Sequence, residues 1–215
     1  MTASRSWLRQ RWLALWRRIG ATGDGKLIFA ILTAHYSEPH RAYHNLAHIE
    51  ACLREFDLVR SSTKTPDGVE IALWFHDAIY DPKANANEEQ SAQLFCAAAK
   101  AALLPKAFIR RVHGLILATR HNSIPANWDA RVMADVDLSI LGKAPAKFSA
   151  YERQIRQEYA WVPKGVFSAG RATILKKFLA RPAIYSTGFF CDRYEMRARK
   201  NMSRSLARLS GRREA

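Results

Sequence analysis

Histidine is the residue whose spacing in this chain first points to chemistry. Four of the seven histidines crowd one stretch, HYSEPHRAYHNLAHIE at residues 35–50, and two of them, His44 and His48, are four residues apart. On a helix this spacing places both imidazoles on one face, about 6 Å apart. Imidazole is a proton donor near neutral pH and a common metal ligand. We expect the other two, His35 and His40, to be structural or surface residues.

Carboxylates accompany histidine at two later points in the chain. WFHDAIYDP joins His76 directly to Asp77, and ADVDLSILG sets Asp135 and Asp137 between apolar residues. A His-Asp pair alone arises readily by chance, whereas the string Tyr-His-Asn-x-x-His is far rarer in a chain of this composition. Divalent transition metals favour mixed imidazole and carboxylate ligands, so side chains of these types would suit a metal site if the fold brings them together.

Helical periodicity dominates the elements that must position these side chains. Apolar residues recur at helical spacing through most of the chain, and alternating strand patterns are nearly absent. We therefore predict an all-α fold, a helical bundle. The expected helices cover approximately residues 1–25, 26–36, 40–59, 68–80, 85–103, 105–120, 130–142, 144–160, 165–180 and 189–209.

The two ends of the chain carry much of its formal net charge of +15. Residues 1–26 hold six basic side chains and one acidic one, and residues 193–215 hold eight and two. We expect an amphipathic helix at residues 1–25 that packs on the rest of the fold, and a basic helix at residues 190–215. No internal boundary is evident, so residues 1–215 are predicted to form a single domain.

Seven strings of the chain resemble those of a known family. In order they are YHNLAHI, FHDAIYDP, NEEQSA, ATRH, DVDLSILG, IRQEY and GRATILKKFLARPAIY, and they span residues 43–185. The order His, His-Asp, Asp is the signature of the HD-domain superfamily. The chain is most similar to a branch of small bacterial proteins described as predicted metal-dependent HD phosphohydrolases. The resemblance covers about two-thirds of the chain.

The resemblance implies roles for particular residues. The metal ligands would be His48, His76, Asp77 and Asp137, with Asp135 the alternative to Asp137 as fourth ligand. His44 matches the position that protonates the leaving oxygen in the related cyclic-nucleotide phosphodiesterases, a role that suits histidine near pH 7.

Other charged residues near these strings are candidates to bind substrate. Arg41 precedes His44 by three residues and could grip a phosphate, although a solvated arginine explains it equally well. Arg120 and His121 follow an apolar run near a helix end. His121, with His113 as a poorer candidate, could instead hold a second metal.

The function that follows is hydrolysis of a phosphoester by metal-activated water. The cofactor would be a divalent ion (Mn, Zn, Fe, Co or Ni, and less suitably Mg), and the substrate a small phosphorylated metabolite or a nucleotide. Two alternatives remain open: a non-catalytic HD module that binds a nucleotide or a protein, and a di-iron HD-fold oxygenase. Specific nucleic-acid binding is not expected because no such motif is present, and a homo-oligomer remains open.

The cysteines and the apolar runs indicate the compartment. Cys52, Cys96 and Cys191 are an odd number, widely spaced, and we interpret them as buried reduced thiols. No apolar run reaches the length of a membrane helix, and arginines interrupt the N-terminal apolar residues. We therefore expect a cytoplasmic protein with no membrane partner.

Overall fold

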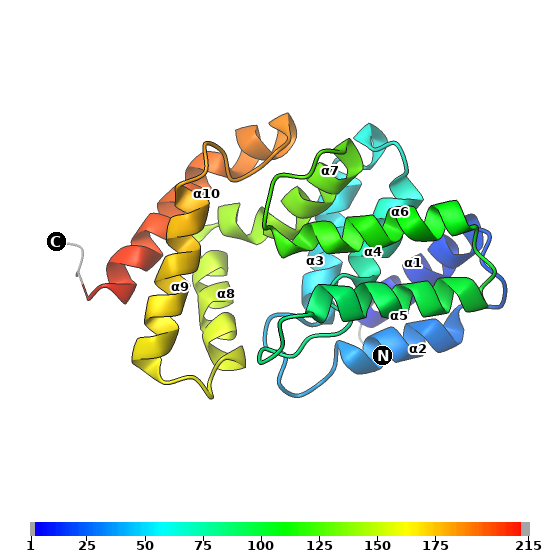
Figure 1. Cartoon of the computed structure of the whole chain (residues 1–215), viewed down its shortest axis with the longest axis horizontal. Helices are drawn as coiled ribbons and strands as arrows, with labels where there is room; N and C mark the ends of the chain where they lie inside the picture. Colours follow the sequence, from blue (N-terminus) through cyan, green and yellow to red (C-terminus); the bar gives the residue numbers. More distant parts are fainter. Residues whose placement is uncertain (1–2, 212–215) are drawn as a thin grey trace. The chain divides into compact units, whose positions relative to one another are not determined.

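The computed structural model describes residues 3–211 and is all-helical over that range (Figure 1). This confirms the expected fold class. The chain divides into two compact units, Met1–Val136 and Asp137–Ala215, so that the boundary falls on the last residue of one helix. The prediction of one HD-type domain over residues 1–215 stays a prediction.

Unit 1 contains the elements that carry the candidate site. Its helices are α1 (Ala3–Arg18), α2 (Lys26–His35), α3 (Leu46–Asp57), α4 (Pro66–Phe75), α5 (Asn87–Ala101), α6 (Lys106–Leu117) and α7 (Trp128–Asp137, whose last residue begins unit 2), with short 3-10 turns η1 (Arg60–Ser62) and η2 (Ala118–Arg120). Helix α4 is the centre of this unit, because every residue from Gly68 to Phe75 is buried. A helix buried on all sides needs apolar residues all round, and EIALWF supplies most of them.

Helix α1 packs on α4 through large aromatic side chains. Trp12 is fully buried, and its ring lies edge-on to Trp74 with 5.4 Å between the centroids. The Trp12 indole N–H donates to the carbonyl oxygen of Gly25 at 2.8 Å, which ties α1 to the start of α2. The N-terminal helix is shorter than the expected residues 1–25, because it ends at Arg18 before a glycine-rich turn.

A group of arginines surrounds one buried carboxylate between α1 and α4. Glu70 is 1% exposed, and its Oε1 accepts from Arg11 Nε at 2.7 Å. Its Oε2 accepts from Arg18 at 2.9 Å and also from Arg60. Part of the basic charge of the N-terminal helix is therefore paired within the fold rather than solvated.

Helix α3 begins later than the sequence suggested. We expected a helix from His40 onward, but residues 40–45 form an irregular loop and α3 starts at Leu46. The cause is Asn45, whose backbone is extended and whose side chain accepts a hydrogen bond from Ala47 N at 2.9 Å. Asparagine is a favoured N-cap because it satisfies a free N–H of the first turn. The assumption that His44 and His48 share a helix was therefore wrong.

Unit 2 contains η3 (Leu138–Gly142), α8 (Pro145–Glu158), α9 (Lys164–Leu179) and α10 (Gly188–Leu209). The turn η3 is held by α10: Asn201 donates to the carbonyl oxygens of Leu141 and Lys143 at 2.8 and 2.9 Å. A Cβ at Gly142 would overlap the side chain of Tyr194 on α10, which explains the glycine that ends DLSILG. The expected basic helix at 190–215 corresponds to α10, and residues 212–215 lie outside the described residues.

Among residues 3–211, no helix is both long and apolar enough to cross a membrane.

Candidate metal centre

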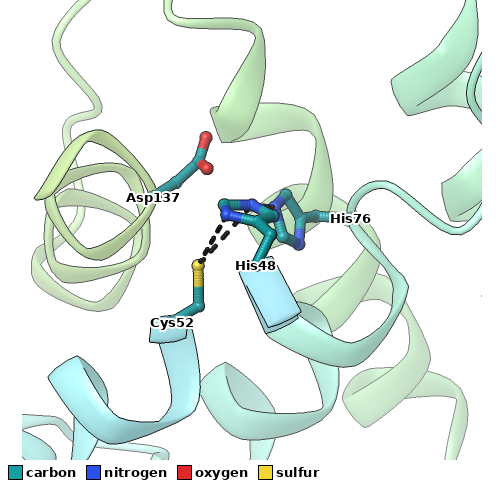
Figure 2. Close-up of side chains that lie close together, drawn as sticks. All are labelled: His48, Cys52, His76 and Asp137. Atoms are coloured by element: carbon teal, nitrogen blue, oxygen red, sulfur yellow. Dashed lines mark hydrogen bonds between the residues drawn. The ribbon is translucent and has the colours of Figure 1, made fainter. Parts of the chain in front are cut away.

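Helix α3 contributes the first side chains of the site. His48 lies in its first turn, is 4% exposed, and has Cys52 one turn farther along the same buried face. The Asn45 cap fixes where α3 begins and therefore which residues of the helix face inward. Figure 2 shows His48 and Cys52 side by side, with His76 beyond them.

The end of helix α4 contributes His76 and Asp77. His76 is 1% exposed, and its Nδ1 lies 2.9 Å from the carbonyl oxygen of Leu73. Because a carbonyl oxygen only accepts, Nδ1 carries the proton and the Nε2 of a neutral His76 presents a lone pair. This backbone contact orients the ring in the way that a metal-binding histidine requires.

Three ligand-type atoms of these residues converge on one point. The Nε2 atoms of His48 and His76 are 3.2 Å apart. The Oδ2 of Asp77 is 3.4 Å from His48 Nε2 and 3.1 Å from His76 Nε2. Acceptor atoms this close together need protons or a metal ion between them.

The separations fit a shared metal ion. Two atoms bound at about 2.0–2.3 Å to one ion, at angles near 90–110°, lie roughly 2.8–3.8 Å apart. All three separations within the triad of His48, His76 and Asp77 fall in that range. The donor chemistry, two imidazoles and a carboxylate, also suits a divalent transition metal.

A group of four residues that includes the histidine pair could hold a metal ion. One ligand atom each of His48, Cys52, His76 and Asp137 lie within 4.8 Å of one another, and the first three residues are buried (Figure 2). Asp137 is the last residue of α7. Asp135, the alternative fourth ligand, is 1% exposed on the same helix and is not part of this group.

The electrostatics of the site keep Asp77 ionised. Burial would raise the pKa of this carboxyl, but the His76 and His48 imidazoles, together with the charge of His44, outweigh burial and hold the pKa well below its ordinary value of 3.8. A carboxylate that is negative at neutral pH beside two imidazoles is the charge state that a cation needs.

Cys52 is a residue of the group that sequence reasoning did not place there. We interpreted it as a buried thiol, and it is indeed 2% exposed. Its Sγ lies 3.7 Å from His48 Nδ1 and 3.6 Å from His48 Nε2. The only signal in the sequence was its spacing of four residues from His48, which puts the two side chains on one helix face.

Arg41 lies beside the site and holds its backbone. Its side chain is 0% exposed, and one terminal nitrogen donates to the carbonyl oxygens of His44 and Asp77 at 3.0 and 2.6 Å. The other terminal nitrogen donates to Ala78 O at 2.9 Å, and Nε donates to Glu38 at 2.9 Å. Every nitrogen of the guanidinium therefore has a partner within the protein.

Two side chains of α5 fix the turn that follows Asp77. Ser91 is fully buried, and its hydroxyl accepts from Ile79 N at 3.0 Å. Asn87 exchanges hydrogen bonds with the backbone of Asp81, at 3.0 and 2.9 Å. The NEEQSA string therefore has a structural role, because its side chains hold the backbone of the FHDAIYDP turn.

His44 lies in the loop before α3, near His48. Its ring stacks on Tyr80 with 4.2 Å between centroids, and its centroid is 6.0 Å from that of His48. His35 and His40, expected to be structural, contact Glu38 and the carbonyl oxygen of Tyr80 respectively.

The remaining predicted residues are not part of the group of four that could hold a metal ion. Arg120 forms an ion pair with Glu89 on α5. His121 follows it with a left-handed backbone, φ 55°, and His113 lies half-buried on α6. Among the described residues, neither histidine belongs to a group that could hold a second metal.

Comparison with family models, curated proteins and solved structures found no match to this chain.

Proposed function

We propose that this protein is a metal-dependent phosphohydrolase. The observation that supports the proposal most directly is the triad of His48 Nε2, His76 Nε2 and Asp77 Oδ2, whose separations of 3.1–3.4 Å suit one divalent ion. The resemblance of the surrounding strings to HD phosphohydrolases agrees with this chemistry. The substrate class is a small phosphorylated metabolite or a nucleotide.

The residues that would hold the ion are His48, His76, Asp77 and Asp137. We favour Asp77 over Cys52 because the sulfur is almost equally far from both ring nitrogens of His48. A ligand that shares an ion with Nε2 must lie clearly nearer to Nε2 than to Nδ1. When bound, the ion would lower the pKa of a water molecule toward neutrality and neutralise phosphate charge.

The other residues of the site would act on the substrate or on the ligands. His44, stacked on Tyr80, is our candidate for the donor of a proton to the leaving oxygen. Arg120 and His121 remain candidates for substrate contacts. Arg41 is better explained as a positioning residue, because a phosphate contact would require its hydrogen bonds to Asp77 and Ala78 to open.

The test is turnover by protein stripped of metal and reloaded with one ion at a time. Wild type, Asp77→Ala and the matched control His113→Ala would be assayed on a generic phosphoester and on a nucleotide panel. We expect metal-dependent hydrolysis that Asp77→Ala lowers by about a hundredfold or more and that His113→Ala leaves within about twofold. Equal activity in all three proteins, or activity without added metal, would contradict the proposal.

A further inference from the structure

A cleft of about 510 Å³ lies in unit 1, and none of its residues belongs to the candidate metal centre. Its volume is within the range of small-molecule sites. The lining residues on which the argument depends come from the loop before α4, from α6 and from the start of α7: Lys64, Thr65, Arg111, Trp128, Asp129 and Arg131. We call this the α4–α7 cleft.

The cleft carries three cations that the fold does not neutralise. Within residues 3–211, no carboxylate forms an ion pair with Lys64, Arg111 or Arg131. Arg131 donates from Nε to the carbonyl oxygen of Pro125 at 2.8 Å, which holds the side chain while its two terminal nitrogens make no hydrogen bond to the described residues. Arginine forks and lysine ammonium groups in this state bind phosphate well.

The one carboxylate of the cleft is already engaged with the backbone. Asp129 Oδ1 accepts from Lys64 N at 2.8 Å, and its Oδ2 accepts from the backbone N and the hydroxyl of Thr65 at 2.9 and 2.5 Å. Asp129 thus fixes the loop that carries Lys64 beside the start of α7. The cleft keeps an excess of two positive charges.

An aromatic side chain completes the cleft. Trp128 is 39% exposed, although its indole N–H donates to the carbonyl oxygen of Ser62 at 2.9 Å. The hydrogen bond holds the ring in one orientation while leaving part of it accessible. A held aromatic surface next to arginine and lysine suits a ligand with a flat ring at one end and phosphates at the other.

We propose that the α4–α7 cleft binds a nucleoside polyphosphate or a closely similar phosphorylated nucleotide. The phosphates contact Arg111, Arg131 and Lys64, and the base lies against Trp128. A mononucleotide is favoured over a nucleic-acid strand because one aromatic residue and three cations line one bounded cleft, whereas a strand needs successive stacking platforms along a groove. The site does not depend on the metal centre.

The cleft and the metal centre lie at opposite ends of the same helix. The loop at Thr65 precedes α4, and His76 and Asp77 follow it. The ten residues of α4 separate the two by about 15 Å along the helix axis. A nucleotide whose phosphates contact Arg111, Arg131 and Lys64 is therefore not in position to be the substrate of the metal centre.

The experiment measures binding of a ribose-labelled fluorescent ATP analogue to the full chain in the presence of EDTA. The proteins compared are wild type, Asp77→Asn, Arg111→Glu and the matched control Arg110→Glu, which changes an exposed neighbour on α6 outside the cleft. We expect Arg111→Glu to weaken binding about tenfold or more, and Arg110→Glu and Asp77→Asn to bind within about twofold of wild type. Asp77→Asn separates this site from the proposed hydrolase, since it would abolish turnover and leave binding intact.

Two further measurements separate the sources of binding. Trp128→Leu should weaken binding of the labelled nucleotide. The affinity for inorganic tripolyphosphate, measured by competition, should stay unchanged. Equal losses of nucleotide affinity in Arg110→Glu and Arg111→Glu would show that binding comes from general charge attraction, and would overturn the proposal. The absence of nucleotide binding by wild type in EDTA would also overturn it. A single-stranded oligonucleotide that binds more than tenfold tighter, with the same response to Arg111→Glu, would overturn the assignment to a mononucleotide.

Discussion

At the scale of single residues, the histidine pair carries the functional argument. The Nε2 atoms of His48 and His76 face each other at 3.2 Å, and the contact of His76 Nδ1 with Leu73 O fixes which nitrogen is available. The types and order of these residues were visible in the sequence. Their convergence was not, because it depends on α3 and α4 packing together.

Cys52 provides a first test at this scale. Because its sulfur lies beside the His48 ring and not nearer to Nε2, we expect it to border the centre without binding the ion. Protein loaded with Co²⁺ should therefore show no thiolate-to-cobalt charge-transfer band in the near ultraviolet, and Cys52→Ser should have the same spectrum. A band present in wild type and absent from Cys52→Ser would show that Cys52 is a ligand.

The pKa of Asp77 predicts a dependence of stability on pH. Burial raises this pKa, but the charge of His76, the hydrogen bonds from His48 and His76, and the charge of His44 outweigh burial and hold the pKa below 3.8 in the folded protein. Below pH 3.8 the unfolded chain then binds the proton more readily than the folded one, so the free energy of unfolding falls as the pH drops further. Urea unfolding of metal-free protein should show this loss. In Asp77→Asn the loss should be smaller, and an identical pH profile would contradict the assignment.

At the scale of elements, the sequence predicted the helices better than their starts. Apolar periodicity located α2 to within one residue and, except for the start of α3, found the ends of the later helices to within about five. It failed before α3, where the histidine spacing suggested a helix from His40 and the Asn45 cap delays it to Leu46. A capping asparagine inside an otherwise helical pattern is a local signal that periodicity does not weigh.

The contacts of Glu70 and Arg41 were beyond sequence reasoning for a different reason. Both are charged residues that the fold buries, and their partners lie far away in the sequence: Arg11 and Arg18 for Glu70, and the carbonyl oxygens of Asp77 and Ala78 for Arg41. Such pairs depend on tertiary packing, which no local pattern encodes. The cost of burying each charge is offset only in the assembled fold.

Glu70 gives the prediction at the scale of elements. Glu70→Ala leaves Arg11, Arg18 and Arg60 without their shared carboxylate and weakens the polar contact between α1 and α4. We expect the free energy of unfolding to fall by about 3 kcal/mol, toward the lower part of the range for buried ion pairs because the arginines can partly reach solvent. Thermal or urea unfolding measures it. The control Glu88→Ala, in the first turn of α5, should cost about 1 kcal/mol or less. Equal losses in the two variants would contradict this role.

At the scale of the whole molecule, helical periodicity predicted the class of fold and composition showed the excess of basic charge, but neither showed how that charge is used. The chain has 34 basic and 19 acidic side chains. Arg11 and Arg18 pair with acidic residues inside unit 1, whereas the charged groups of Arg111, Arg131 and Lys64 line a cleft and form no ion pair among residues 3–211. Net charge alone does not distinguish a structural arginine from one that can bind an anion.

The measurement that tests the central claim most directly is the number of divalent ions bound per chain. Metal-stripped wild type, His76→Ala and His113→Ala would be dialysed against Mn²⁺, Co²⁺ or Zn²⁺, and the bound metal determined by elemental analysis. We predict about one ion per chain in wild type and in His113→Ala, and a loss of affinity of about a hundredfold in His76→Ala, because an inner ligand is removed. The same metal content in His76→Ala as in wild type would contradict a metal centre at His48 and His76.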